Sequence, residues 1–214
     1  MSYAVKEMFL TLQGEGVHAG RRAVFVRFAG CNLWSGLERD RSTAICRFCD
    51  TDFIGMDGEG GGRFRTAAAL AEAAATVWAG DRESRFVVLT GGEPMLQVDE
   101  ALIQALHDQG FFIAIESNGT LAVPRAIDWI CISPKARSET VQRSGDELKL
   151  VWPQDGSDWQ AMQGWDFAHL LLQPKDAISD QAASQAHLES AIGFVQAHPK
   201  WRLSLQTHKI LGLA

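Results

Sequence analysis

The sequence has few cysteines, no long apolar run and no signal peptide. Its 214 residues include four cysteines, which is far below the density of small secreted domains that disulfides hold together. No apolar stretch approaches the roughly 18–20 residues that a membrane-spanning helix needs. The first residues lack the basic start and apolar block of a signal peptide. We therefore expect a cytoplasmic protein whose thiols stay reduced.

The sequence also lacks an excess of positive charge. Lys and Arg together number 20 and Asp and Glu 26, which gives a formal net charge of −6. Phosphate binding needs a concentration of Lys and Arg, so we expect neither nucleic acid nor a membrane as a partner. With 46% hydrophobic residues, the chain fits one domain, residues 1–214, that buries its own core.

Short apolar runs rich in β-branched residues alternate with helical patterns. The predicted strands are residues 23–30, 86–92, 111–119, 129–135, 147–152 and 170–175, with a last strand and turn at 202–212. The predicted helices are residues 66–79, 96–109, 157–163 and 180–197, with a short helical connection at 123–127. This alternation predicts an α/β fold of parallel strands covered by helices. About six strands favour a partial, open TIM-like barrel, because a closed one needs about 250 residues.

Polar residues follow nearly every predicted strand. They lie at residues 30–31, 90–93, 116–118, 133–135, 173–175 and 206–208. The carboxyl ends of parallel strands meet at one edge of a sheet, and ligands bind there. The sequence therefore predicts a single site at this edge.

Three cysteines lie close together directly after the first of these strands. Fourteen residues separate Cys31 from Cys46, and two separate Cys46 from Cys49. Three thiolates favour zinc, copper(I) or an iron–sulfur cluster. A structural zinc site needs four ligands, for which His18 is near enough in sequence, whereas Cys131 alternates with isoleucines and is expected to be a buried apolar residue. A [4Fe–4S] cluster on three cysteines keeps one iron open to a further ligand.

The sequence resembles the radical S-adenosylmethionine (SAM) superfamily. The resemblance rests on these cysteines, on the aromatic Phe48 directly before the last of them and on the GGEP at residues 91–94. The long first gap departs from the usual CxxxCxxC. With this spacing, the sequence is similar to the 7-carboxy-7-deazaguanine synthase family. The other motifs that carry the similarity are LQGEG (residues 12–16), Arg27, CDT (49–51), ESNGT, SPK and QPKD. The resemblance covers the chain nearly end to end, with a cluster-loop insertion at about residues 32–62.

The resemblance implies a ring contraction on the route to queuosine. The substrate, 6-carboxy-5,6,7,8-tetrahydropterin, becomes 7-carboxy-7-deazaguanine with loss of ammonia. The [4Fe–4S] cluster on Cys31, Cys46 and Cys49 would bind SAM at its open iron and cleave it to a 5′-deoxyadenosyl radical, which takes a hydrogen from the substrate. The resemblance also implies Mg²⁺ on Thr51, a flavodoxin or ferredoxin as reductant, and a homodimer. A cap or turn hydroxyl is the alternative role for Thr51.

The resemblance assigns SAM contacts to the strand ends and to the residues beside the last cysteine. Gly91 and Gly92 would let the backbone approach the methionine moiety, and Glu93 would accept its ammonium. The alternative is a tight turn with Pro94 at the first helical position. The full set is Phe48, Cys49, Asp50, Gly91, Gly92, Glu93, Ser117, Ser133, Pro134, Lys135, Gln173, Pro174, Lys175 and Asp176.

The candidates for substrate binding are Leu12, Gln13, Gly14, Glu15, Arg27, Thr90, Glu116 and His208. Of these, Glu15, Arg27 and Glu116 are also expected to be catalytic. Gln13 and Glu15 suit the amide and guanidine edge of a pterin. The planar fork of Arg27 suits its carboxylate, and burying Arg27 in an apolar strand without a partner would be costly. His208 is equally well explained as a helix-capping residue. Family members commonly end in a carboxylate near the substrate, and this chain ends in Ala214.

Two other functions fit part of the pattern. One is a radical SAM activase acting on a partner protein, and the other is a non-catalytic, zinc-stabilised binding module. LQGEG and Arg27 suit a small polar heterocycle and are not needed by an activase. The sequence therefore favours the small-molecule lyase.

Overall fold

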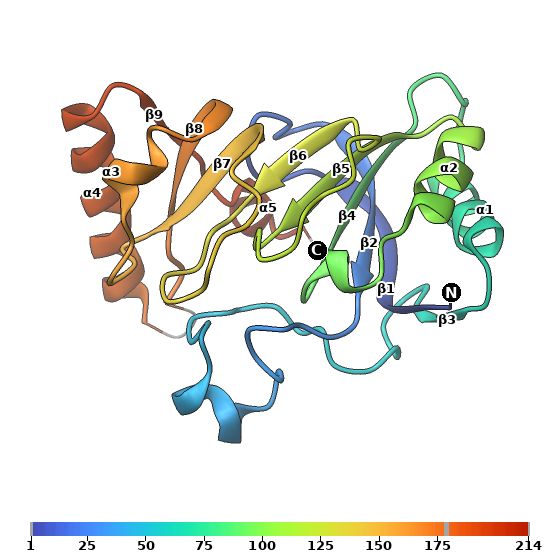
Figure 1. Cartoon of the computed structure of the whole chain (residues 1–214), viewed down its shortest axis with the longest axis horizontal. Coiled ribbons are helices and arrows are strands. Elements are labelled where there is room, and N and C mark those ends of the chain that lie inside the picture. Colours follow the sequence, from blue (N-terminus) through green and yellow to red (C-terminus); the bar gives the residue numbers. More distant parts are fainter. Residues whose placement is uncertain (1, 178–179, 214) are drawn as a thin grey trace.

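One curved, open sheet runs through the molecule in the computed structural model, which describes residues 2–177 and 180–213 (Figure 1). The strand order in the described chain is β3-β1-β2-β4-β5-β6-β7-β8-β9. β1 is antiparallel to its neighbours β2 and β3, and every other pair is parallel. The strands are β1 (Tyr3–Leu12), β2 (Arg22–Phe28), β3 (Gly62–Phe64), β4 (Phe86–Gly91), β5 (Phe112–Ser117), β6 (Trp129–Ile132), β7 (Ser144–Trp152), β8 (Asp166–Pro174) and β9 (Trp201–Leu203).

The predicted parallel, open α/β architecture is confirmed, with differences at both ends of the chain. Strand β1 was not predicted because a bulge between Val5 and Glu7 interrupts its alternation, and the charged Lys6 is buried there. The prediction of one strand and turn over residues 202–212 was wrong. The chain forms only the short strand β9 and then helix α5 (Thr207–Leu211).

The helices α1 to α4 begin after side chains that accept a backbone hydrogen bond, whereas α5 has no such cap. Thr66 caps α1 (Ala67–Trp78), Asp99 caps α2 (Glu100–Asp108), Asp158 caps α3 (Trp159–Met162) and Asp180 caps α4 (Gln181–Ala197). The helix predicted from residue 96 therefore starts later, after a separate 3₁₀ turn, η2 (Pro94–Leu96). Residues 123–127 contain one turn, at residues 125–126, instead of the predicted helical connection. None of the described helices is long and apolar enough to cross a membrane.

Two apolar clusters hold the helices against the sheet. The larger packs Leu70 and Leu102, from α1 and α2, against strand residues such as Val87. The smaller joins Leu148 and Leu172 with Ala191 of α4. Because side chains alternate across a strand, the neighbours of these core residues point to the other face of the sheet.

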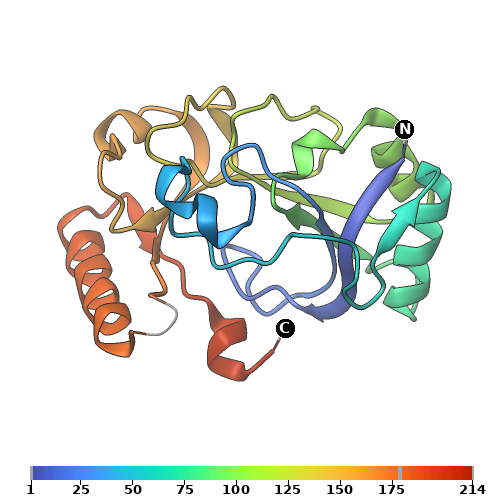
Figure 2. The ribbon, with the colours of Figure 1, turned by 90° about the horizontal axis from the view of Figure 1, so that it is seen from below.

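The long connection from β2 to β3 lies outside the sheet. Apart from a 3₁₀ turn, η1 (Glu38–Thr43), it has no helix or strand. It projects from one edge in Figure 1, and it lies across the sheet when seen from below in Figure 2. This segment carries the three cysteines to the carboxyl ends of the parallel strands.

Candidate active site

A cavity of about 410 Å³ opens at the carboxyl ends of the parallel strands. This volume falls within the usual range for small-molecule sites, roughly 300–1,000 Å³. With the exceptions of Glu93 and Pro134, every site residue predicted from the sequence lines it. The expectation that the strand-end motifs converge is therefore confirmed, while their individual roles stay predictions.

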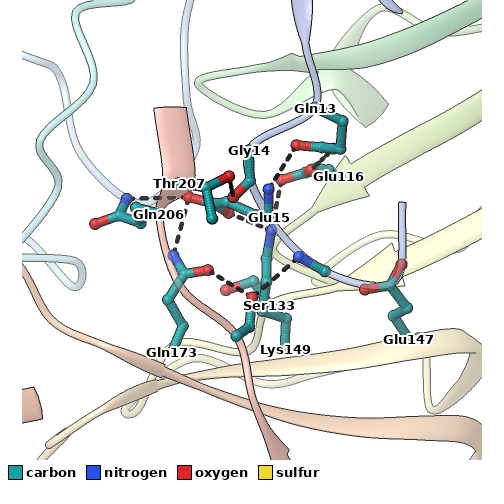
Figure 3. A network of polar contacts seen from close by, with 12 residues as sticks. Gln13, Gly14, Glu15, Glu116, Ser133, Glu147, Lys149, Gln173, Gln206 and Thr207 are labelled. Atoms are coloured by element: carbon teal, nitrogen blue, oxygen red, sulfur yellow. Dashed lines mark hydrogen bonds and ion pairs between the residues drawn. The ribbon is translucent and has the colours of Figure 1, made fainter. Parts of the chain in front are cut away.

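The side chains of Glu15, Glu116 and Lys149 lie together among the residues that line this cavity (Figure 3). We call this cluster the floor of the cavity. The Lys149 ammonium on β7 lies 2.5 Å from Glu15 Oε2 and 2.9 Å from Glu116 Oε2. Gln173 and Gln206 each donate to Glu15 Oε1 at 3.0 Å. Since all of these side chains come from the ends of strands or from short turns after them, the floor is formed by regular elements of the sheet.

The floor residues stabilise each other's charged forms. Burial alone would raise the pKa of Glu15, but the Lys149 charge and the hydrogen bonds from Lys149 and Gln206 hold this pKa at about 2. Burial alone would lower the pKa of Lys149, but the charges of Glu116 and Glu15 outweigh it and raise this pKa. The Lys149 side chain is only 4% exposed, so this ammonium depends on the two carboxylates for solvation.

Gln13 and the C-terminal helix complete the floor. Gln13 donates to Glu116 Oε1 at 2.8 Å and accepts from the backbone of Glu15. Gly14 O accepts from both the backbone and the hydroxyl of Thr207. A Cβ at Gly14 would lie 2.1 Å from His208 Nδ1. Glycine is therefore required for α5 to pack against the LQGEG segment and to bring His208 to the cavity.

The three clustered cysteines also line this cavity. The Cys46 thiol donates to Cys49 and holds the pKa of Cys49 at about 6, whereas the pKa of Cys46 is raised. Burial raises the pKa of Cys31. The neighbouring Asn32 accepts from Asn118 at 2.9 Å, which ties the start of the loop to the end of β5. Among the described residues, no trio of His, Cys, Asp or Glu is close enough to bind a single metal ion.

Comparisons with known proteins decide the family. Residues 41–144 match the model of the radical SAM superfamily. Proteins named 7-carboxy-7-deazaguanine synthase from Bordetella pertussis and Bradyrhizobium diazoefficiens are each 57% identical over 213 residues, covering 100% of this chain and of theirs. The chain belongs to the 7-carboxy-7-deazaguanine synthase family. The structure titled QueE from Escherichia coli has a TM-score of 0.68 at 25% identity, covering 96% of this chain and 94% of that one.

Membership makes this protein a radical SAM enzyme, which uses a [4Fe–4S] cluster and SAM. Soft thiolates are the ligands that iron–sulfur clusters require, and the three cysteines share one cavity in which Cys49 ionises readily. The donor set therefore fits a cluster. His18 does not line this cavity and instead packs on Trp129 with ring centroids 4.4 Å apart, so the zinc interpretation lacks the histidine proposed for it.

The strand-end glycines of this 7-carboxy-7-deazaguanine synthase family member are packed closely. A Cβ at Gly92 would lie 2.1 Å from Gly30 O and 3.0 Å from Cys31 Cβ. Gly91 has a φ of 141°, and a Cβ there would lie 2.3 Å from Phe28 O. The turn after β4 consequently passes directly beside the cysteine segment.

Glu93 and Pro134 lie behind the cavity wall. The Glu93 carboxylate is fully buried and accepts from the Ser117 hydroxyl at 2.8 Å and the Asn118 backbone at 2.7 Å. It also accepts from Met95 N, and it precedes Pro94 at the start of η2, as the tight-turn alternative expected. Its contacts position Ser117, which lines the cavity, and its contact with the SAM ammonium stays a prediction.

Several residues of the predicted SAM set hold one another. Lys135 Nζ donates to the backbone and hydroxyl oxygens of Ser133 at 2.7 Å. Lys209, on α5, contacts both Asp50 and Asp176 at 2.6 Å. The Lys175 ammonium lies 6.0 Å from the centroid of the Phe48 ring. Through Lys209, the C-terminal helix links the cysteine loop to the loop after β8.

Arg27 has a partner that the sequence argument did not foresee. Its Nε lies 2.7 Å from Glu7 Oε1, because β1 and β2 pair Glu7 directly with Arg27. Glu7 therefore supplies a partner for the buried guanidinium, and the binding of a substrate carboxylate by Arg27 stays a prediction. Both residues line the cavity, so Arg27 remains at the space where a ligand carboxylate is expected.

The candidate site residues left out several polar residues that line the cavity, among them Glu7, Lys149, Gln206 and Lys209, although Gln206 belonged to the predicted strand-end cluster at residues 206–208. Lys149 had a detectable signal, since it is a charged residue between Leu148 and Leu150 near the end of a predicted strand. Gln206 and Lys209 flank the predicted His208. Cys131 is buried in β6, as expected, and does not line the cavity. Ala214 lies outside the described residues.

Proposed function

We propose that this chain converts 6-carboxy-5,6,7,8-tetrahydropterin to 7-carboxy-7-deazaguanine with loss of ammonia. The observation that carries the proposal is one cavity that is lined both by the three cysteines and by the polar residues Gln13, Glu15 and Glu116. A cofactor bound at the cysteines and a heterocycle bound on the floor would face each other across this space. The relatives' shared name supports the same activity.

The floor suits the donor-rich edge of a pterin. Glu15 and Glu116 present carboxylate oxygens as acceptors, and the Gln13 amide supplies a donor and an acceptor. Arg27, at the β2 end of the cavity, would bind the substrate carboxylate through the N–H groups that Glu7 does not occupy. The neighbouring Leu12, Gly14, Thr90 and His208 would enclose the ring.

The cofactor end is served by residues around the cysteines. Gly91 and Gly92 expose backbone to the cavity, and Ser117, Ser133 and Lys135 offer polar groups at the next strand ends. When bound, the cluster and SAM supply a 5′-deoxyadenosyl radical that removes a hydrogen from the substrate. The protein orients the two ligands, and its lining excludes water from the space between them.

Four further parts of the proposal rest on the family resemblance. Thr51 lines the cavity beside the cysteines and would offer its hydroxyl to Mg²⁺, which keeps several waters and takes oxygens from the substrate. We propose a flavodoxin or ferredoxin as reductant, a homodimeric assembly and a cytoplasmic location, in which the cysteines stay reduced. The whole chain, 1–214, would act as one domain.

The test is anaerobic incubation of cluster-reconstituted protein with SAM, dithionite, Mg²⁺ and the carboxytetrahydropterin. We expect stoichiometric conversion to 7-carboxy-7-deazaguanine with release of ammonia. A brown, cluster-loaded protein that cleaves SAM without forming this product contradicts the assignment of substrate. A colourless protein that retains one zinc after reconstitution contradicts the cluster itself.

A further inference from the structure

Lys149 is a buried cation placed between two carboxylates that the proposed function uses for substrate binding. Its ammonium contacts Glu15 at 2.5 Å and Glu116 at 2.9 Å, and its side chain is 4% exposed. The carboxylates themselves are 14% and 21% exposed, respectively. Two carboxylates and one ammonium give the floor one net negative charge.

Other titratable groups face this trio from the surrounding elements. Glu147, on the same strand as Lys149, is buried and accepts from Trp129 Nε1 at 2.6 Å and from the Val17 backbone at 3.2 Å. Cys131 faces Lys149 from β6, and His208 faces Glu15 from α5. Burial raises the pKa of Cys131 and of Glu147. Lys149 is thus the cation in direct contact with both floor carboxylates in the described chain.

We infer that Lys149 is a positioning residue that keeps Glu15 and Glu116 ionised and separate, so that both accept hydrogen bonds from the donor edge of the substrate. The inference rests on the proposed function for the identity of that edge. It concerns charge at the floor and assigns Lys149 no proton transfer.

The physical reason lies in what two neighbouring carboxylates do without a cation. Carboxylates that share a poorly solvated site bind one proton between them, because two like charges at close range are unfavourable. A carboxyl group that holds the proton becomes a donor. It would then face the N–H groups of a guanidine-amide edge with the wrong polarity, and the unpaired donors would weaken binding.

The first experiment measures equilibrium binding of the carboxytetrahydropterin to cluster-loaded protein with SAM but without reductant. The variant is Lys149→Met, whose unbranched side chain is similar in length to that of lysine and carries no charge. We expect about tenfold or weaker binding near neutral pH, equivalent to 1.4 kcal/mol or more, and recovery as the pH rises. Lys149→Arg should bind with the pH-independent affinity of the wild type. Lys200→Met, at an exposed position, is the matched control and should bind as the wild type does.

The second experiment is independent of substrate and of the proposed function. Infrared difference spectra, with Glu15→Gln and Glu116→Gln used for assignment, report whether either carboxyl is protonated. We expect no signal assigned to a protonated Glu15 or Glu116 in the wild type at neutral pH and one such signal in Lys149→Met, which disappears at alkaline pH. The double variant K149M/E116Q should show none, because only one floor carboxylate remains.

The outcomes separate the inference from the proposed function. Pterin binding to Lys149→Met with the wild-type affinity at every pH, or no carboxyl signal in that variant, overturns the role of Lys149. If Lys149→Met does not fold, the wild-type spectrum decides, since a protonated Glu15 or Glu116 there contradicts the inference. If the wild type forms no deazaguanine, the proposed function is contradicted. The infrared spectra still test whether Lys149 keeps the two carboxylates ionised, because they need no substrate.

Discussion

The floor of the cavity and the cysteine loop line the same space but are built differently. The floor residues lie at the ends of regular strands, and buried ion pairs and hydrogen bonds hold them to one another. The cysteines lie on a connection whose sole regular element in the described chain is the η1 turn. Arg41 steadies this loop by donating to the backbone of Cys49 at 3.1 Å and by lying 4.0 Å from the Trp34 ring centroid.

This difference indicates that the floor is formed without any ligand, whereas the cysteine loop depends on a bound metal cluster for its structure. The floor is held together without a ligand, because Lys149 neutralises one of its two negative charges and Gln13, Gln173 and Gln206 donate hydrogen bonds to the carboxylate oxygens. The cysteines have no cation in direct contact among the described residues, and the pKa of Cys46 and of Cys31 is raised. Metal binding replaces the thiol protons and couples to local folding, so the loop is expected to depend on the cluster far more than the floor does.

The largest expected effect comes from removing a cluster ligand. Cys49→Ala should abolish the brown cluster and product formation, because the remaining two thiolates cannot hold the cluster. The free energy of unfolding should change by less than about 1 kcal/mol, since the loop lies outside both apolar clusters. Visible absorbance, iron content and urea unfolding check this. Cys131→Ala is the control: it should keep the cluster, and loss of the cluster in that variant would contradict the assignment of ligands.

A substitution at the boundary of the floor and the cysteine loop should damage both. Gly92→Ala places a Cβ 2.1 Å from Gly30 O, so the backbone before Cys31 must move. We expect about 1–3 kcal/mol of destabilisation and much reduced iron content. The control is Gly193→Ala in α4, where a Cβ would meet nothing within 4 Å; it should stabilise by up to about 1 kcal/mol. Equal iron content in both variants would show that this turn does not position Cys31.

The ion pairs of the floor should make the free energy of unfolding depend on pH in the acid range. The pKa of Glu15 is about 2 in the folded protein, against 4.5 for an ordinary glutamate. A lowered folded-state pKa contributes stability that is complete above 4.5 and is lost as the pH falls towards 2. Urea unfolding at a series of pH values should show a loss on the order of 2–3 kcal/mol in this window. Glu15→Gln should flatten the curve, and an unchanged slope in that variant would mean that Glu15 is not held by Lys149.

The smallest expected effect concerns the link between α5 and the cysteine loop. Lys209→Ala removes the ion pairs with Asp50 and Asp176. The Lys209 side chain is 37% exposed, and such ion pairs contribute about 0–1 kcal/mol. We expect little change in melting temperature and a several-fold weaker SAM affinity. Because salt screens exposed charges, the difference from wild type should shrink at high salt. A difference that persists at high salt would contradict an electrostatic link.

Much of the site could be predicted from sequence because parallel strands make placement simple. Residues directly after buried strands meet at one edge, so Thr90, Glu116, Ser133 and Gln173 could be placed together without knowing the sheet order. The cysteine spacing and neighbouring motifs then indicated the family. These inferences depended on local patterns and one general rule of topology.

What could not be predicted depends on pairings between distant residues. The Arg27–Glu7 ion pair requires strand β1, whose bulge hides its alternation. The burial of Glu93 behind Ser117 follows from hydrogen bonds across two strand ends. Lys149 was visible as a charge in a strand, but its two partners lie 134 and 33 residues away. Chemical type alone did not reveal which charges neutralise each other.

Hydrogen–deuterium exchange of the apo protein and the cluster-reconstituted protein, followed by peptide, tests this account of the floor and the cysteine loop most directly. We predict that reconstitution slows exchange strongly in residues 31–55 and leaves residues 13–16, 113–117 and 147–151 unchanged, because the floor is already complete without the cluster. Equal protection of both regions on reconstitution, or no change in residues 31–55, would contradict the account.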